Sequence, residues 1–182
     1  MELESLPEPD STTTTLHSII TVNIRGFNPG IHYGKIEYLK DLALDKKAFM
    51  ITLTESHLSE GVSDSEMSLD GWYISRCDRK NRIGGGVITV IKDHLTVSDE
   101  LSRSDSITEY LCCVIHEINM AVITIYRPPD CPTKSFSDCL DSISEWISNI
   151  LSKRNDIKLY ITGDFNFGFV NWEEENLLNF KE

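Results

Sequence analysis

Carboxylate, amide and phenol side chains follow four separate strand-like runs of this sequence. Asn23 and Tyr126 end two of the runs, Glu55 follows a third, and Asp164 with Asn166 follows the last. Strand ends are rigid anchors, and ligand sites gather in the loops just beyond them. The two-residue step from Asp164 to Asn166 predicts that both side chains point to one side of an extended segment. If the strands run side by side, these groups converge on one point.

The side chains suit hydrolysis of a phosphodiester with the help of Mg²⁺. Mg²⁺ takes one or two carboxylates together with water and phosphate oxygens, and Glu55 supplies such a ligand, with Mn²⁺ as a possible substitute. Asp164 is placed to orient or deprotonate the attacking water. Asn23, Asn166 and Tyr126 are neutral donors for the charge that builds on the phosphate oxygens.

Each of these features also has a purely structural interpretation. Glu55 could be a surface carboxylate, Asn23 a strand-end cap, and residues 163–166 (Gly-Asp-Phe-Asn) only a turn. Residues 126–129 (Tyr-Arg-Pro-Pro) could simply stiffen the entry of a loop. His57 is interpreted as a packed or solvated histidine and is not assigned to the site. The chemical interpretation therefore depends on the complete set of residues in this order.

Strands alternate with two helices along the chain. Apolar and β-branched runs predict strands at 17–24, 48–54, 72–76, 84–92, 109–117, 120–126 and 157–162. Helical spacing of apolar residues predicts helices at 34–47 and 135–154, the second opened by a capping pair of Ser135 and Asp138. The apolar face predicted for that helix consists of Phe136, Leu140, Ile143, Ile147 and Ile150. The pattern predicts an α/β (α+β) fold with a mixed sheet architecture and helices outside.

Net charge argues against a general nucleic-acid binder. The chain carries −12, although residues 76–82 (RCDRKNR) form a locally basic loop. The candidate substrate-binding residues of this loop are Arg76, Arg79, Lys80 and Arg82. The alternative is a solvated loop without a ligand. Any binding to double-stranded DNA is expected to be weak and to fall as the salt concentration rises.

Composition points to an intracellular protein, nuclear or cytoplasmic, with no membrane partner. No apolar run approaches the ~20 residues that a membrane span needs. Residues 1–16 are acidic and polar, which indicates a disordered tail rather than a secretory signal, and one domain is expected over 17–182. The five cysteines form no CxxC pair, and reduced thiols are the expected state. Oligomeric state has no signature in the sequence.

At these motifs the chain resembles the endonuclease/exonuclease/phosphatase (DNase I-like) family, and within it the N-terminal endonuclease domain of non-LTR (LINE-type) retrotransposons. The resemblance covers residues 17–175 and includes the stretch 53–95, the "IYRPPD" motif at 125–130 and "YITGDFNFGFVNW" at 160–172. It implies a two-sheet sandwich flanked by helices. It also implies a nick in chromosomal DNA that primes a reverse transcriptase carried by the parent element.

The resemblance implies a role for each matching residue. Glu55 binds the divalent metal with Asn23 beside it, Tyr126 and Asn166 contact the scissile phosphate, and Asp164 acts on the nucleophilic water or the leaving group. The family also uses a late Ser-Asp-His motif and further strands. After Asn166 the sequence given contains neither histidine nor aspartate. We therefore expect residues 1–182 to be a weak or inactive form that lacks the last strands.

Three functions follow from these observations. The first is a DNA-nicking endonuclease of retrotransposon origin. The second is a non-catalytic remnant that keeps the fold and acts as a binding module. The third is a phosphoesterase of the same superfamily, which the match over residues 53–95 and 125–130 disfavours.

Overall fold

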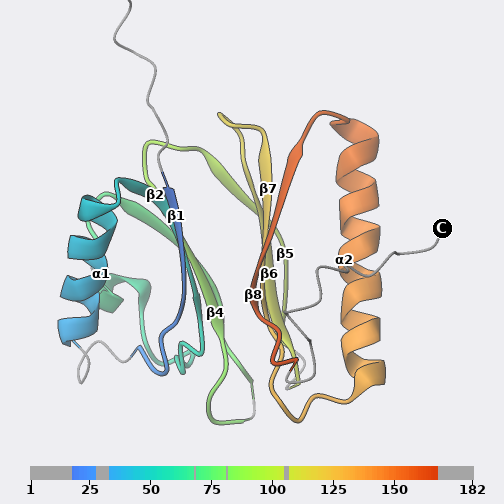
Figure 1. Cartoon of the computed structure of the whole chain (residues 1–182), viewed down its shortest axis with the longest axis horizontal. Coiled ribbons are helices and arrows are strands. Elements are labelled where there is room, and N and C mark those ends of the chain that lie inside the picture. The colour runs from blue at the N-terminus through green and yellow to red at the C-terminus, as the bar shows by residue number, and fades with distance from the viewer. Residues whose placement is uncertain (1–17, 28–32, 68, 81, 105–106, 168–182) are drawn as a thin grey trace, which may run out of the picture.

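Two four-stranded β-sheets pack face to face, and one helix covers the outer side of each (Figure 1). The structure is a computed structural model that describes residues 18–27, 33–67, 69–80, 82–104 and 107–167. The elements in chain order are β1 (Ser18–Asn23), α1 (Tyr33–Asp45), β2 (Ala48–Thr54), the 3₁₀ turn η1 (Asp64–Met67), β3 (Trp72–Cys77), β4 (Val87–Lys92), β5 (Val97–Ser104), β6 (Glu109–Ile115), β7 (Met120–Tyr126), α2 (Thr133–Lys153) and β8 (Lys158–Asp164). This architecture confirms the expected α/β class with a two-sheet sandwich.

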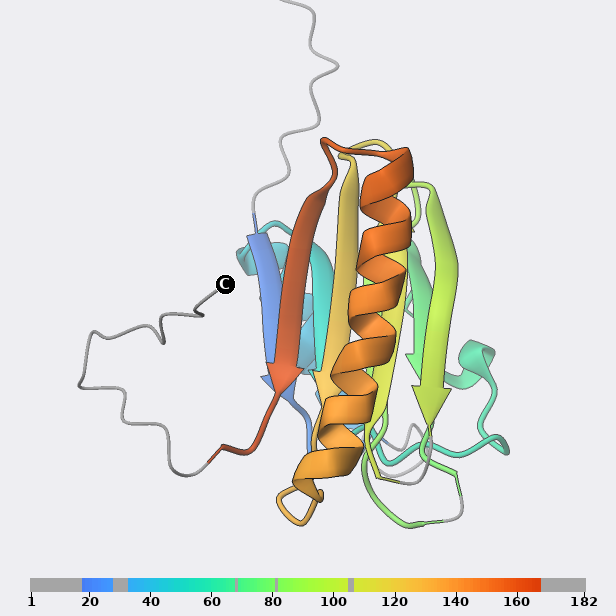
Figure 2. The same cartoon turned by 90° about the vertical axis from the view of Figure 1, so that its right-hand side faces the viewer.

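Both sheets are mixed, and each has one parallel pair at one edge. The strand order is β1-β2-β4-β3 in the first sheet and β5-β6-β7-β8 in the second. β1 runs parallel to β2, and β7 runs parallel to β8, whereas the other neighbours are antiparallel. β1 and β8 lie side by side across the two sheets, as Figure 2 shows. The C-terminal ends of these four strands therefore meet at one end of the sandwich.

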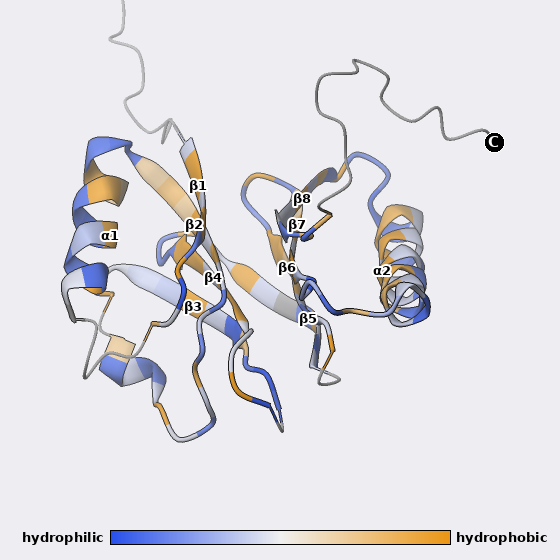
Figure 3. Cartoon of the chain, turned by 60° about the horizontal axis from the view of Figure 1, so that its bottom comes forward, coloured by the Kyte–Doolittle hydropathy of each residue, from blue (hydrophilic) through white to orange (hydrophobic). Residues whose placement is uncertain are grey.

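Apolar side chains fill three layers between the four layers of secondary structure. Ile36 and Leu39 of α1 pack on Ile51 and Leu53 of the first sheet. A second cluster fills the space between the sheets, where the buried residues are Phe49, Met50, Ile91, Leu95, Cys113, Ile115 and Val122. The third lies under α2, whose buried positions are Phe136, Cys139, Ile143, Trp146 and Ile150. The hydropathy colouring in Figure 3 shows the apolar sides of both helices turned toward the sheets.

Several predicted boundaries differ from the structure for identifiable reasons. β5 is not among the predicted strands, because its sequence VSDELSRS is too polar to give an apolar run. The prediction that Ser135 and Asp138 form an N-terminal capping pair is wrong. The helix starts at Thr133 behind an extended Pro132, and Asp138 pairs with Lys134 at 3.2 Å. Leu140 is 41% exposed, and Cys139 and Trp146 occupy the buried face instead.

The cysteines carry free thiols, as the sequence predicts. All five cysteines are buried and free of disulfides, and Cys112 and Cys113 pack into different layers, as alternation along a strand requires. Residues 1–16, the expected tail, lie outside the described residues, as do residue 17, Trp172 and the end of the chain. Among the residues that are described, no helix combines the length and the apolar character needed to cross a membrane.

Candidate active site

Four of the predicted residues lie together where β1, β2, β7 and β8 end: Asn23, Glu55, Tyr126 and Asp164. The two sheets are tied to each other just before this point, because Thr21 of β1 hydrogen-bonds Thr52 of β2 and Thr162 of β8, both at 2.9 Å. Asn23 and Thr54 are register partners at the end of the first parallel pair, and Tyr126 and Asp164 are partners at the end of the second. Topology therefore brings together residues that are up to 141 positions apart.

Asn23 connects the two carboxylates of the cluster. Its Nδ2 donates to Oε1 of Glu55 at 2.9 Å and to Oδ2 of Asp164 at 2.8 Å. Its own Oδ1 accepts from the backbone N–H of Arg25 at 3.2 Å, which fixes the orientation of the amide. One neutral side chain thus holds Glu55 and Asp164 close together without adding charge.

Tyr126 contributes a buried phenol to the same cluster. Its hydroxyl donates to Oε1 of Glu55 at 3.2 Å. The other carboxylate oxygen, Oε2, lies 3.7 Å from Nε2 of His57, which is beyond hydrogen-bond length. Glu55 therefore receives two donors on one oxygen and presents the second toward the partly exposed side of the site.

Left-handed backbone surrounds this cluster. Arg25, Glu55, His57 and Asn166 have φ values of 46°, 55°, 54° and 48°, which side chains other than glycine adopt at a cost of about 1–3 kcal/mol each. These residues follow the ends of β1, β2 and β8, where the chain must turn sharply. Strain gathered at one edge of a sheet is a feature of ligand sites.

Asn166 does not share the orientation expected for it. β8 ends at Asp164, and the left-handed φ of Asn166 interrupts the two-residue alternation on which the expectation was based. Its backbone N–H donates to Oδ1 of Asp164 at 3.2 Å, while its Nδ2 donates to the carbonyl of Arg127 at 2.8 Å. Arg127, which is buried, returns hydrogen bonds to the carbonyls of Phe165 and Asn166. As it stands, Asn166 positions Asp164.

His57 is a residue that sequence reasoning left out. It follows Glu55 by two positions, and the left-handed conformation of both residues turns its ring back toward that carboxylate. Its backbone N–H donates to the carbonyl of Gly85 at 2.9 Å, which joins the end of β2 to the loop before β4. A single histidine after a glutamate has no diagnostic spacing, so only the structure places it here.

The four candidate basic residues occupy different environments. Arg76 lies 3.2 Å from Asp64 and 3.5 Å from Asp78, and Arg82 pairs with Asp130 at 2.7 Å. Lys80 is exposed. Arg79, a candidate substrate-binding residue, is buried: its side chain is 4% exposed and pairs with the fully buried Glu109.

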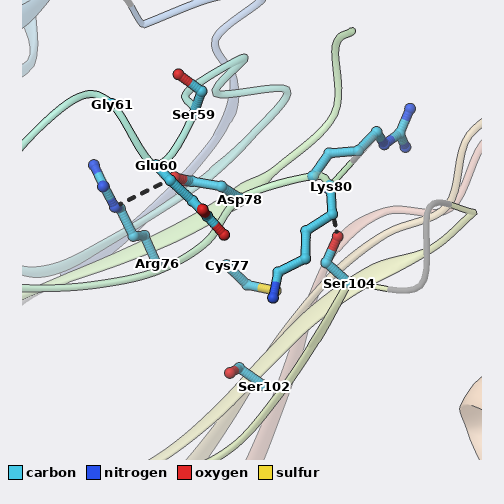
Figure 4. Close-up of a pocket in the computed structure, with 10 residues that line it drawn as sticks. Ser59, Glu60, Gly61, Arg76, Cys77, Asp78, Lys80, Ser102 and Ser104 are labelled. Carbon is cyan, nitrogen blue, oxygen red and sulfur yellow. Dashed lines mark hydrogen bonds and ion pairs between the residues drawn. The ribbon is translucent and has the colours of Figure 1, made fainter. Parts of the chain in front are cut away.

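A polar hollow of about 730 Å³ lies beside these residues, between β3, β5 and the loop at 59–61 (Figure 4). Ser102 and Ser104 of β5 line one side, and Arg76 and Asp78 line the other, with Lys80 between them. Glu55, Tyr126 and Asp164 do not line it. The hollow is therefore separate from the carboxylate cluster, although both are at the same end of the sandwich.

Burial and the nearby Glu55 together raise the pKa of Tyr126 to about 12. The phenol is removed from water, and the negative carboxylate beside it, which also accepts its hydrogen bond, opposes a second negative charge. Tyr126 therefore remains a hydrogen-bond donor throughout the neutral and mildly alkaline range.

We expect the spectroscopic titration of wild type minus that of Tyr126→Phe to show a phenol that ionises near pH 12 rather than at the ordinary 10.0. The difference isolates one of six tyrosines. Because the folded-state pKa is the higher one, the stability from this group is complete below pH 10.0 and is lost as the pH rises toward about 12. A difference midpoint at 10 would show that Tyr126 is neither buried nor held beside Glu55 as the structure has it.

No protein-family model and no curated protein matches the sequence, whereas solved structures match the fold. The 3′–5′ exonuclease NExo from Neisseria meningitidis superposes with a TM-score of 0.59 at 18% identity, over 81% of this chain and 57% of its own. The endonuclease domain of TRAS1, a telomere-specific non-LTR retrotransposon, gives 0.51 at 17%, over 81% and 59%. A mannosyl-6-phosphatase from Bacteroides thetaiotaomicron gives 0.55 at 11%, over 81% and 64%.

These structural neighbours are members of the endonuclease/exonuclease/phosphatase family. The expected resemblance, including that to a non-LTR retrotransposon endonuclease, is thus confirmed at the level of fold. The chain spans less than two thirds of the length of each of them. At such low identity the likeness shows the fold alone.

Proposed function

We propose that this fold carries a Mg²⁺-dependent site that cleaves phosphodiester bonds of double-stranded DNA, as the nicking endonuclease domain of a non-LTR retrotransposon element. The observation that carries the proposal is the bridge that Asn23 forms between Glu55 and Asp164, with Tyr126 on the same carboxylate. An intracellular location, nuclear or cytoplasmic, and a reverse transcriptase elsewhere in the parent element belong to the same proposal. A structure of this fold, the 3′ phosphatase NExo from Neisseria bound to a product DNA hairpin, supports DNA as the substrate.

The donor set of the cluster fits a hard divalent cation. Glu55 has one oxygen held by Asn23 and Tyr126, and its second oxygen lies 3.7 Å from Nε2 of His57. Within the described ranges no cluster of three or more acidic, histidine or cysteine side chains could hold a metal ion. Mg²⁺ takes few protein carboxylates and keeps several waters, so a single carboxylate such as Glu55 can anchor it. Glu55 would hold Mg²⁺ or Mn²⁺ through Oε2, and Asn23 would join it by turning its amide oxygen away from the N–H of Arg25. The ion would neutralise charge on the phosphate.

The chain's own residues supply the remaining chemistry. Asp164 is fixed by Asn23 and by the backbone of Asn166, so its carboxylate is oriented to accept a proton from an attacking water. The N–H of Asn23 and the O–H of Tyr126 both point at Oε1 of Glu55, and by turning from that carboxylate to the phosphate they would stabilise charge on the non-bridging oxygens. A phosphate contact by Asn166 requires its amide to leave the carbonyl of Arg127.

We expect Glu55→Gln to weaken Mn²⁺ binding at least tenfold and to abolish Mg²⁺-dependent nicking of a supercoiled plasmid. The change keeps the size of the side chain and removes the charge that would hold the cation. Calorimetry of the metal and gel analysis of the plasmid, with EDTA as a blank, give two independent readouts. Glu60→Gln, an exposed glutamate five positions away, is the matched control and should leave both unchanged.

The metal readout tests the site independently of turnover. Metal binding that depends on Glu55 without any cleavage would favour the non-catalytic binding module. Unchanged Mn²⁺ affinity in Glu55→Gln would refute the proposed metal site.

A second candidate function is hydrolysis of a small phosphoester. The observation in its favour is that the same fold carries a mannosyl-6-phosphatase, and nothing in the cluster of Asn23, Glu55 and Asp164 distinguishes a DNA phosphate from any other. A soluble phosphomonoester offered in parallel with the plasmid separates the two. Turnover of the monoester alone would replace the endonuclease proposal.

A further inference from the structure

A short turn at residues 24–27 joins the end of β1 to the residues that carry the carboxylate cluster. Three of its backbone N–H groups donate to three successive carbonyls at and just beyond the end of β2. These bonds measure 2.9, 2.7 and 2.7 Å and run from Ile24 to Thr54, from Gly26 to Glu55 and from Phe27 to Ser56. The remaining N–H, that of Arg25, donates to Oδ1 of Asn23 at 3.2 Å. The turn therefore touches Asn23 on one side and the backbone of Glu55 on the other.

The carbonyls of the same turn meet one ammonium group. Nζ of Lys35 lies 2.7, 3.0 and 2.8 Å from the carbonyl oxygens of Ile24, Arg25 and Gly26. A lysine ammonium has three N–H donors, and here all three are used on successive carbonyls. Backbone carbonyls outside helices and sheets need such partners. Lys35 thus completes the hydrogen bonding of the turn.

The helix that carries Lys35 does not favour a lysine at this position. Lys35 lies in the first turn of α1, which contains no acidic residue. The N-terminal end of a helix carries partial positive charge, so acidic side chains are preferred there and cations are disfavoured. α1 begins at the end of the sandwich where β1 ends, as Figure 1 shows. A cation placed against local electrostatics, with every donor used on the turn, indicates a role outside the helix.

The conformation of the turn depends on a compensating partner. Arg25 and Gly26 have left-handed φ values of 46° and 91°, which turn the carbonyls of residues 24–26 toward one side of the chain. For Arg25, which has a Cβ atom, this conformation is unfavourable and persists only where the surroundings fix it. The three hydrogen bonds from Lys35 supply that constraint. Without them the turn can relax, and its bonds to Asn23 and Glu55 relax with it.

We propose that Lys35 is a positioning residue for the carboxylate cluster, which holds Asn23 and Glu55 in place by fixing the turn between them. The inference rests on the proposed function, because this positioning matters for activity only if the cluster binds a metal ion and cleaves a phosphodiester. Lys35 acts through the turn, since its hydrogen bonds within the described part of the chain go to the three carbonyls and not to the carboxylates.

The test compares wild type, Lys35→Ala and Lys40→Ala as whole 182-residue chains. Lys35→Ala should lower Mn²⁺ affinity and the kcat of Mg²⁺-dependent plasmid nicking by about 10–100-fold, the usual effect of losing a residue that orients a metal ligand. KM should be unchanged, because the lysine does not touch the substrate. Lys40 lies on the same helix and pairs with Glu37 at 3.1 Å, so Lys40→Ala is the matched control and should behave as wild type.

A small ammonium ion separates positioning from folding. Alanine removes every atom of Lys35 beyond Cβ, and n-propylammonium replaces that length together with its three N–H donors. It should restore most of the lost Mn²⁺ affinity and kcat at a temperature where circular dichroism shows both proteins folded. Tetramethylammonium, which has no N–H group, should restore neither. Lys35→Met, which keeps the apolar stem, should show the same losses and takes the place of Lys35→Ala if alanine prevents folding.

Hydrogen exchange provides a readout without metal or substrate. The N–H of Gly26, which donates to the carbonyl of Glu55, should exchange faster in Lys35→Ala than in wild type. Unchanged exchange at Gly26 would overturn the route through the turn.

The remaining outcomes separate this inference from the proposed function. Equal Mn²⁺ affinity and equal kcat in wild type and folded Lys35→Ala would overturn the positioning role and leave the proposed function intact. A rise in KM alone, with a weaker salt dependence of DNA affinity, would make Lys35 a phosphate contact and also overturn it. Losses that follow only the folded fraction would assign Lys35 to stability. Wild type that neither binds Mn²⁺ nor nicks the plasmid would remove both proposals.

Discussion

Gly163→Ala is expected to lower the free energy of unfolding by roughly 3–5 kcal/mol, or to prevent folding. Gly163 has a φ of +143°, and a Cβ atom there would lie 1.8 Å from the carbonyl oxygen of Ile125 and 2.7 Å from its carbon. Ile125 is its register partner across the parallel β7–β8 pair. The clash is with the backbone of the neighbouring strand β7, so no side-chain rotation relieves it.

Gly163 also immediately precedes Asp164, so the substitution should affect the site before it unfolds the domain. Any shift of β8 that relieves the clash moves the Asp164 carboxylate away from Nδ2 of Asn23, which it now meets at 2.8 Å. Urea unfolding followed by circular dichroism measures the stability, and Mn²⁺ calorimetry measures the site.

Gly34→Ala is the matched control for Gly163→Ala. Gly34 lies in α1 with nothing within 4 Å of its would-be Cβ and no left-handed φ, so alanine should stabilise the chain by about 0.5–1 kcal/mol. The diagnostic result is a change of opposite sign in the free energy of unfolding for the two substitutions. A loss below about 1 kcal/mol for Gly163→Ala would contradict the parallel β7–β8 register on which the site depends.

The strands that carry the site were the most predictable part of the fold. β2 and β7 are buried along nearly their whole length, so their sequences AFMITLT and MAVITIY are continuous apolar runs with clear ends. β5 escaped prediction because an edge strand with one solvated side needs few apolar residues, and only Val97 and Leu101 mark it. Local pattern therefore detects buried strands better than edge strands.

The convergence of the site residues depends on sheet order, which no local pattern contains. The chemistry of Asn23, Glu55, Tyr126 and Asp164 was visible in the sequence, and their position at strand ends made a shared site plausible. That β1 lies beside β8 across the two sheets is known only from the structure. Asn166 was predicted to share the orientation of Asp164 because strand alternation was assumed to continue, but its left-handed φ ends the alternation.

The basic loop at residues 76–82 shows what a count of charges cannot predict. The count does not reveal which of the charges are paired inside the protein. Arg79 and its neighbours looked like one solvent-facing basic patch. Glu109, thirty residues later at the start of β6, neutralises Arg79 inside the protein. A buried carboxylate opposite an arginine leaves no signature in the sequence around the arginine.

Arg79→Met is therefore expected to destabilise the fold by about 3–5 kcal/mol, without removing a DNA phosphate contact. Arg79 donates to both oxygens of Glu109, one of them at 2.9 Å, and the two side chains are 4% and 0% exposed. The guanidinium also lies 5.4 Å from the ring centroid of Tyr126. Removing it leaves a buried carboxylate whose remaining donor among the described residues is the N–H of Gly86, at 3.4 Å.

A double-mutant cycle separates the cost of an orphaned charge from the value of the pair. Glu109→Leu in the Arg79→Met background should recover most of the lost stability, since replacing both members of a buried ion pair by apolar side chains is often close to neutral. Urea unfolding of the four proteins gives the coupling energy. An additive cycle, in which the double variant is less stable than either single one, would contradict this account of the pair.

Lys80→Ala provides the comparison that distinguishes an anchor from a phosphate contact. It should leave the unfolding free energy unchanged. The slope of the logarithm of DNA affinity against the logarithm of salt concentration should fall by about one, the contribution of one phosphate contact. The folded fraction of Arg79→Met should instead keep the wild-type salt dependence, because its guanidinium never reaches the surface. A lower salt slope for Arg79→Met at full folding would mean that the arginine leaves Glu109 to meet DNA, and the β3–β4 loop would then have to open when the substrate binds.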